Sequence, residues 1–187
     1  MKHTEKRPAG RQGAALSLFN WLQALIAALV GISLLFTFVG RLTPVDGISM
    51  EPTLVHGDLM LIQTLGYIPR QGDVVVLTKA FDAADGPIVK RVIATGGQTV
   101  EIDYEARMVY VDGLPLDEPY LKTAMVPPHY ENLTCVQVPE GSIFVMGDNR
   151  NASGDSRDVT LGPVDVRYVI GGARFVLFPL RDFGAIR

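Results

Sequence analysis

The pattern of hydrophobic and polar residues divides the chain into one long apolar stretch and a series of short ones. No charged residue occurs between Gln12 and Gly40, and the centre of this stretch, residues 21–36, contains only two polar side chains. About 20 such residues are enough to cross the roughly 30 Å of hydrocarbon in a bilayer. The pattern therefore predicts a transmembrane anchor over residues 14–39.

Two other interpretations of this stretch fit less well. A cleavable signal peptide has an apolar core of only about 7–15 residues and a small-x-small exit, whereas this stretch is longer and leaves through Phe38-Val39-Gly40-Arg41. A buried core helix would rarely run so far without a charge. We therefore expect an anchor that is not cleaved.

Residues 1–13 form a basic segment in front of the anchor. They contain four basic residues and one acidic residue. Basic flanks of a membrane span stay in the cytoplasm. We therefore expect a cytoplasmic N-terminus, and an extracytoplasmic domain over residues 41–187 of a single-pass protein in the cell membrane.

After residue 54 the apolar residues form short runs that alternate with polar ones or end at turn-forming residues. Asp112-Gly113 at the end of the run 108–111 is a strong hairpin signal, whereas residues 114–134 are Pro-rich and predict an irregular surface loop. No helical period of useful length follows. The fold class expected is mostly β, a compact antiparallel sheet closed into a barrel or sandwich. Strands are predicted over 58–63, 73–78, 88–95, 99–103, 108–111, 135–138 and 142–146, with a final pair within 166–180 around Gly171-Gly172.

Composition limits the chemistry that this domain can perform. The 187 residues leave room for one membrane segment and one domain, and a net charge of −3 gives no reason to expect a nucleic-acid partner. The single cysteine, Cys135, can form neither an internal disulfide nor a cysteine metal cluster. The three histidines lack the spacing of a zinc site. We therefore expect no metal and no cofactor.

A first candidate group is Ser49, which lies between Gly47 and Pro52 in a segment of turn-forming residues. Such a bent backbone can present a hydroxyl group, although ordinary tight turns have the same composition. Ser49 follows Gly40 by nine residues, and nine extended residues span at most about 30 Å. Ser49 must therefore lie close to the outer surface of the membrane.

A second candidate is Lys90, within the run Ile88 to Ile93. Alternation places Lys90 on one face with Ile88 and Val92, and Arg91 on the other face. A lysine extending from an edge strand is the ordinary interpretation. If Lys90 is instead buried, its pKa would fall from about 10.4 toward the 7–8 that suits a general base. Arg91 cannot lose its proton, so a buried Arg91 would need a carboxylate partner.

The third segment, Gly147 to Arg157, is rich in turn-forming residues. Asn149, Asn151 and Ser153 match the spacing of the first ligands in a calcium loop, but the position of its bidentate glutamate is taken by Thr160. Calcium binding is therefore not expected.

Taken in order behind the anchor, three motifs resemble those of bacterial type I signal peptidases. They are Gly47-Ile48-Ser49-Met50-Glu51-Pro52-Thr53-Leu54, Lys90-Arg91-Val92-Ile93, and Gly147-Asp148-Asn149-Arg150 with the residues up to Arg157. Members of that family are membrane-bound serine proteases with a Ser–Lys dyad. The resemblance implies removal of signal peptides from secretory preproteins, after small residues at −1 and −3, beside the lipid bilayer and the export translocon.

The resemblance also implies roles for single residues. Ser49 would be the nucleophile and Lys90 its general base, and the hydroxyl of Ser153 would orient the lysine. Asp155 would pair with Arg91 or with Arg157. The Ser49 amide would donate to the oxyanion. In part of the family a serine two positions before the nucleophile supplies a second donor, and that position is Gly47 here. Met50 and apolar strand residues would line shallow substrate pockets.

Three alternatives remain to be compared with this interpretation. A Ser-His-Asp protease would need His56 or His129 as base, and neither lies in a recognisable motif. Self-cleaving repressors share the Ser–Lys dyad but have a DNA-binding module where this chain has an anchor. A membrane-tethered β-domain that binds a ligand without catalysis would fit the same composition and topology.

Overall fold

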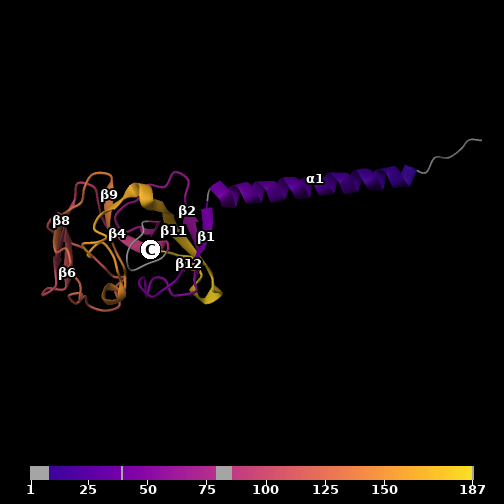
Figure 1. Cartoon of the computed structure of the whole chain (residues 1–187). Coiled ribbons are helices and arrows are strands. Elements are labelled where there is room, and N and C mark those ends of the chain that lie inside the picture. Colours follow the sequence, from indigo (N-terminus) through magenta and orange to yellow (C-terminus); the bar gives the residue numbers. More distant parts are fainter. Residues whose placement is uncertain (1–8, 39, 79–85, 187) are drawn as a thin grey trace, which may run out of the picture. The chain divides into compact units, whose positions relative to one another are not determined.

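A computed structural model describes residues 9–38, 40–78 and 86–186. The chain divides after residue 39 into two compact units. The first contains helix α1 (Ala9–Phe38), drawn in indigo in Figure 1. Within α1, residues Leu16–Leu34 are long and apolar enough to cross a membrane, and their side chains are exposed. This helix covers the described part of the predicted anchor.

The second unit, Gly40–Arg187, is built from two antiparallel sheets, which confirms the predicted fold class. The larger sheet has the strand order β1-β2-β11-β3-β4-β9-β10, and β12 also pairs with β11. Its strands are β1 (Gly40–Pro44), β2 (Leu59–Gln63), β3 (Val74–Leu77), β4 (Ile88–Thr95), β9 (Ser142–Met146), β10 (Val164–Asp165), β11 (Val169–Phe178) and β12 (Gly184–Ala185).

The smaller sheet has the order β7-β6-β5-β8. Asp112 and Gly113 adopt positive φ angles of 53° and 77° in the turn between β6 and β7, as the hairpin signal predicts. The sheet contains β5 (Thr99–Asp103), β6 (Met108–Val111), β7 (Leu114–Pro115) and β8 (Cys135–Gln137). Three short 3-10 helices complete the unit: η1 (Arg150–Ala152), η2 (Val166–Tyr168) and η3 (Leu180–Asp182).

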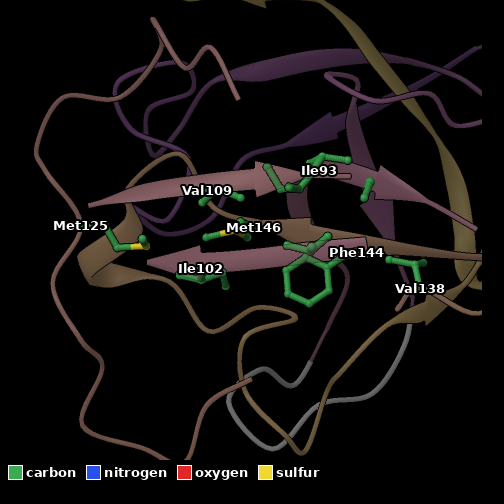
Figure 2. Close-up of a cluster of buried hydrophobic side chains, with 10 residues drawn as sticks. Ile93, Ile102, Val109, Met125, Val138, Phe144 and Met146 are labelled. Carbon is green, nitrogen blue, oxygen red and sulfur yellow. The ribbon is translucent and has the colours of Figure 1, made fainter. Parts of the chain in front are cut away.

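Buried side chains hold the two sheets together and support the loops between them. One cluster joins Ile93 of β4 and Phe144 of β9 to Ile102 and Val109 of the smaller sheet, and Met125 closes it from the loop after β7 (Figure 2). A second cluster lies under the segment that follows β1, and consists of Val45, Met50, Leu54, Met60, Ile62, Val74, Val76, Ala173 and Val176. The strands that carry the candidate residues therefore belong to a packed core.

The predicted strand pair within residues 166–180 is wrong, because one strand, β11, runs through both glycines. β11 pairs with β3 over its first half and with β2 over its second. A Cβ on Gly171 would lie 2.2 Å from the Gln63 carbonyl oxygen, and one on Gly172 would lie 2.5 Å from the Tyr67 ring. The glycines thus allow close approach within a strand rather than a turn.

Strand β1 was not predicted, because its residues show no hydrophobic alternation. Gly40–Pro44 forms this strand by pairing with β2, from Gly40 opposite Gln63 to Pro44 opposite Leu59. Pairing with a neighbouring strand therefore orders a segment that has no strand signal of its own.

Candidate active site

The segment after β1 folds into a turn that carries Ser49 at its apex. Gly47 adopts a φ of +93°, the left-handed region that favours glycine. Inside the turn, the amide of Glu51 donates to the Ile48 carbonyl at 3.2 Å and the amide of Leu54 donates to that of Met50 at 2.9 Å. Met50 and Leu54 are buried in the second core cluster. The packing of Met50 and Leu54 in the core thus fixes the turn, while Ser49 itself stays half-buried.

The loop that follows β9 forms hydrogen bonds to the same turn. The Asn149 amide donates to the Ser49 carbonyl at 3.0 Å, and the Asn149 side chain donates to the Ile48 carbonyl at 3.1 Å. The first and third motifs of the sequence, about 100 residues apart, are therefore joined directly at the serine.

Lys90 reaches Ser49 from strand β4. Its Nζ donates to Ser49 Oγ at 2.7 Å and to the Val89 carbonyl at 3.0 Å. β4 lies between β3 and β9, so the alternative of a lysine on an edge strand is wrong. Only 4% of Lys90 is exposed. Burial lowers the pKa of Lys90 to about 8, with Asp155 and Asp148 acting to raise it and Arg157 to lower it.

Asp155 pairs with Arg157, which decides between the two arginines that the sequence left open. Its carboxylate accepts from Arg157 Nε at 2.8 Å, from Arg157 Nη2 at 2.9 Å and from the Gly147 amide at 3.0 Å. Burial alone would raise the pKa of Asp155. The Arg157 charge and these hydrogen bonds outweigh burial and hold that pKa below its ordinary value. The pair therefore stays ionised beside the lysine.

Arg91 does have the carboxylate partner that its burial requires, but the partner is Asp148 and not Asp155. Arg91 Nε donates to Asp148 Oδ1 at 2.8 Å and Nη2 donates to Oδ2 at 2.7 Å. Thr53, in the Ser49 turn, also donates to this carboxylate. Sequence reasoning missed Asp148, although it lies in the third motif. The register that pairs Arg91 with Met146 of β9 would have placed it close by.

Ser153 is buried next to these groups, but the hydrogen bond expected between it and Lys90 does not form in this structure. Among the described residues, Ser153 Oγ has no partner at hydrogen-bond geometry. The donor bonds of Lys90 go to Ser49 Oγ and the Val89 carbonyl. An orienting role for Ser153 stays a prediction.

A cavity of ≈ 750 Å³ lies beside Ser49 and Lys90. Its lining consists of residues 43–50, residues 86–90, Ala152 and Gly154. Met50 contributes to this lining, but its side chain is only 2% exposed and packs in the core. Apolar Pro44, Ile48 and Ile88 offer surface for small aliphatic groups. The cavity is thus bordered by the Ser49 turn together with the end of β1 and the start of β4.

The Ser49 amide, the expected oxyanion donor, and the amide of Gly47, two positions before it, differ in their hydrogen bonding. Among the described residues, the Ser49 amide donates no hydrogen bond. The Gly47 amide donates to His56 Nδ1 at 3.3 Å, and this nitrogen lies 3.2 Å from the Asp46 carboxylate. Within the described ranges, no cluster of three His, Cys, Asp or Glu side chains is arranged to hold a metal ion. The contact between the Lys90 amine and the Ser49 hydroxyl suits nucleophilic attack by a serine activated by an amine.

Comparison with known proteins finds close relatives over most of the chain. Residues 18–178 match the family described as signal peptidase, peptidase S26. A probable signal peptidase I-1 of Synechocystis sp. is 39% identical over 172 residues, covering 87% of this chain and 83% of the relative. The signal peptidase I of Bacillus licheniformis is 35% identical over 188 residues, covering 96% and 97%. A crystal structure of a signal peptidase I from Enterococcus faecalis is 30% identical, with a TM-score of 0.45 over 56% of this chain and 96% of that one.

Proposed function

Because the chain belongs to the signal peptidase family, peptidase S26, we propose that it removes N-terminal signal peptides from exported preproteins with a Ser49–Lys90 dyad. It is a serine endopeptidase that cuts after small residues at −1 and −3. The observation that carries the assignment of the dyad is the 2.7 Å hydrogen bond from the buried Lys90 amine to Ser49 Oγ, at the wall of the ≈ 750 Å³ cavity.

Lys90 acts as general base in the first step. A serine hydroxyl is a weak nucleophile until a base takes its proton. With a pKa of about 8, about one tenth of Lys90 is neutral at pH 7, and this fraction rises as the pH passes through 8. The neutral amine accepts the Ser49 proton as Oγ attacks the scissile carbonyl. The resulting ammonium then protonates the leaving amine, so that the same nitrogen is ready to activate water for hydrolysis of the acyl-enzyme.

The negative charge that develops on the carbonyl oxygen requires hydrogen-bond donors that are already in place. The Ser49 amide is the first donor, and it makes no competing hydrogen bond within the described chain. Gly47 has no side-chain hydroxyl to act as the second donor. Its amide is held by His56, so this amide could serve only after that bond is broken.

The pocket walls explain the preference for small residues. Ile48, Ile88 and Val89 line the same cavity as Ser49 and Lys90, so a bulky substrate side chain bound there would overlap with them. Pro44 and Val45 extend the lining toward β1. We propose that these walls accept Ala at −1 and −3 and reject Phe or Lys.

The anchor places the enzyme in the membrane from which its substrates emerge. We propose that α1 crosses the cell membrane with its basic N-terminus in the cytoplasm, that residues 41–187 lie outside, and that the export translocon is close by. Length and apolar composition of residues Leu16–Leu34 support the crossing, and the basic residues before it support the orientation. Confinement in one bilayer raises the encounter rate between enzyme and preprotein.

A preprotein cleavage assay with the full chain in detergent tests the dyad. Wild type should release the mature protein, and Ser49→Ala and Lys90→Ala should each abolish release. Ser142→Ala, the same change on strand β9, should keep wild-type activity. A non-catalytic binding domain predicts the opposite, namely unchanged ligand binding by Ser49→Ala and no product from wild type.

Specificity and topology are tested separately. A version that begins near Arg41 should cut a short peptide with Ala at −1 and −3, although slowly, and should not cut one with Phe at either position. Efficient cleavage of the Phe peptide would contradict the steric argument. Protease added to spheroplasts should degrade residues 41–187, so protection of this part would contradict the proposed orientation.

A further inference from the structure

The connection between β7 and β8 lies against the loop that carries Asp148 and Asp155. We call residues 116–130 of this connection the strap. Arg150 donates to the Glu118 carboxylate through Nη1 at 3.1 Å and also through Nη2. Asn151 and the strap exchange two hydrogen bonds, from its Nδ2 to the Ala124 carbonyl at 3.0 Å and to its Oδ1 from the Val126 amide at 2.9 Å. Hydrogen bonds from Arg150 and Asn151 thus join the strap to this loop.

The strap is itself attached to the core. Met125 is 1% exposed and packs in the cluster shown in Figure 2, next to Met146 and Ile102. Tyr130 reaches the Ser153 carbonyl at 3.4 Å. A segment without regular secondary structure is therefore held in one conformation by its contacts.

Tyr120 connects the strap to strand β4. Its ring lies 4.0 Å from the centre of the Arg91 guanidinium, and its hydroxyl donates to Glu118 at 2.9 Å. Arg91 is buried, and its Nε and Nη2 donate to Asp148. Its Nη1 donates to the Gly72 carbonyl at 2.8 Å. The Tyr120 ring on the face of the guanidinium restrains Arg91 further, and such contacts are strongest where water is excluded.

From Arg91 the contacts continue to the serine. Asp148 accepts from Thr53, which lies four residues after Ser49 in the same turn, and the next residue, Asn149, donates its amide to the Ser49 carbonyl. Arg91 also directly follows Lys90 in β4. One guanidinium is therefore connected to both the strand that carries the base and the turn that carries the nucleophile.

We propose that the strap is a positioning element for the dyad, and that Tyr120 and Glu118 are positioning residues that hold Ser49 against Lys90 through Arg91 and Arg150. This inference rests on the proposed function of the dyad. Neither residue lines the cavity beside Ser49. Loosening the strap should therefore slow the chemical step without weakening substrate binding.

The pH dependence offers a readout that mere loss of stability would not move. The charges that act on Lys90 are Asp155, Arg157 and Asp148, and only Asp148 is paired with the arginine that the strap covers. When Arg91 is less firmly held, it compensates the Asp148 charge less well. The Lys90 ammonium is then stabilised, so the rising limb of the pH–rate profile moves to higher pH.

The test uses the full chain in detergent with a preprotein substrate, and compares Tyr120→Leu, Tyr120→Phe and Glu118→Gln. Tyr120→Leu should lower kcat by about tenfold with KM within about twofold, because it removes the stacked ring. Tyr120→Phe keeps the ring and should retain most of the activity. Tyr110→Leu, the same change on β6, is the matched control and should behave as wild type.

Wild-type kcat and pH profile in Tyr120→Leu would overturn the proposal, as would an effect on KM alone. If Tyr120→Leu shows no cooperative unfolding transition, Glu118→Gln decides, since it keeps the shape of the side chain. Reduced kcat with unchanged KM in this variant supports the proposal, and wild-type kcat overturns it. A wild-type chain that cuts no preprotein would instead refute the proposed function, so the two failures are distinguishable.

Discussion

Replacing Lys90 with methionine should stabilise the chain at neutral pH while abolishing cleavage. Lys90 is 4% exposed, and burial lowers its pKa from 10.5 to about 8. The charged amine is therefore less stable in the folded protein than in the unfolded chain. Methionine is unbranched, uncharged and able to fill irregular space. It can occupy the same site without the cost of burying a charge.

The magnitude follows from the difference between the two pKa values. At about 1.36 kcal/mol per pKa unit, the change from 10.5 to about 8 amounts to about 3 kcal/mol. The substitution also removes hydrogen bonds to Ser49 Oγ and the Val89 carbonyl, at about 1 kcal/mol each. We therefore expect Lys90→Met to raise the free energy of unfolding by about 1 kcal/mol at pH 7.

The sign of this difference should reverse with pH. Below about pH 8 the lysine is protonated in both states, so wild type bears the full cost. Between about pH 8 and 10.5 the unfolded chain binds more protons than the folded one, and wild-type stability rises relative to the variant. At the upper end of this window Lys90→Met should be the less stable protein by about 2 kcal/mol, the value of the two lost hydrogen bonds.

Urea unfolding of the full chain in detergent, at intervals from pH 6 to 10.5, measures this difference. Tyr67, Tyr104, Tyr120 and Tyr130 have pKa values raised by burial, but they are common to both proteins and cancel in the subtraction. Lys122→Met is the control, because that lysine is exposed and its charge stays hydrated. Parallel stability curves for wild type and Lys90→Met would refute the conclusion that Lys90 loses its proton at a lower pH in the folded protein than in the unfolded chain. The pH–rate profile of wild type should rise with a midpoint near pH 8 for the same reason.

Two further predictions concern the surroundings of the dyad and the sheet. Asp155→Asn should lower the free energy of unfolding by about 3–5 kcal/mol in thermal or urea unfolding, because it leaves the Arg157 charge buried without a carboxylate. It should also move the rising limb of activity to lower pH, since Asp155 acts to raise the pKa of Lys90; unchanged stability would contradict the structural role. Gly171→Ala should lower the free energy of unfolding by about 1–3 kcal/mol through overlap with the Gln63 carbonyl. Gly184→Ala on strand β12, where nothing lies within 4 Å of the added carbon, should change stability little, and equal effects of the two glycine substitutions would refute the overlap.

Elements with a strong local signal were predicted well from the sequence. The run from Ile88 to Thr95 became β4 with the predicted bounds, and Asp112-Gly113 forms the predicted hairpin turn. Residues without such a signal were missed, as strand β1 shows. Gly171 and Gly172 misled the prediction, because composition does not distinguish a glycine needed for a turn from one needed for close approach.

The sequence by itself determined the β class, the long apolar helix and the requirement that a buried Arg91 have a carboxylate. These follow from residue type and short-range period, which act within a few positions of the chain. Only the tertiary structure decided that the carboxylate is Asp148, that Arg157 takes Asp155, and that Tyr120 covers Arg91. Such partners are set by strand register and loop packing. Asp155 and Arg157 are 2 positions apart in the chain, whereas Arg91 and Asp148 are 57 apart. The free energy of burying a charge demands a partner but does not specify where along the chain it comes from.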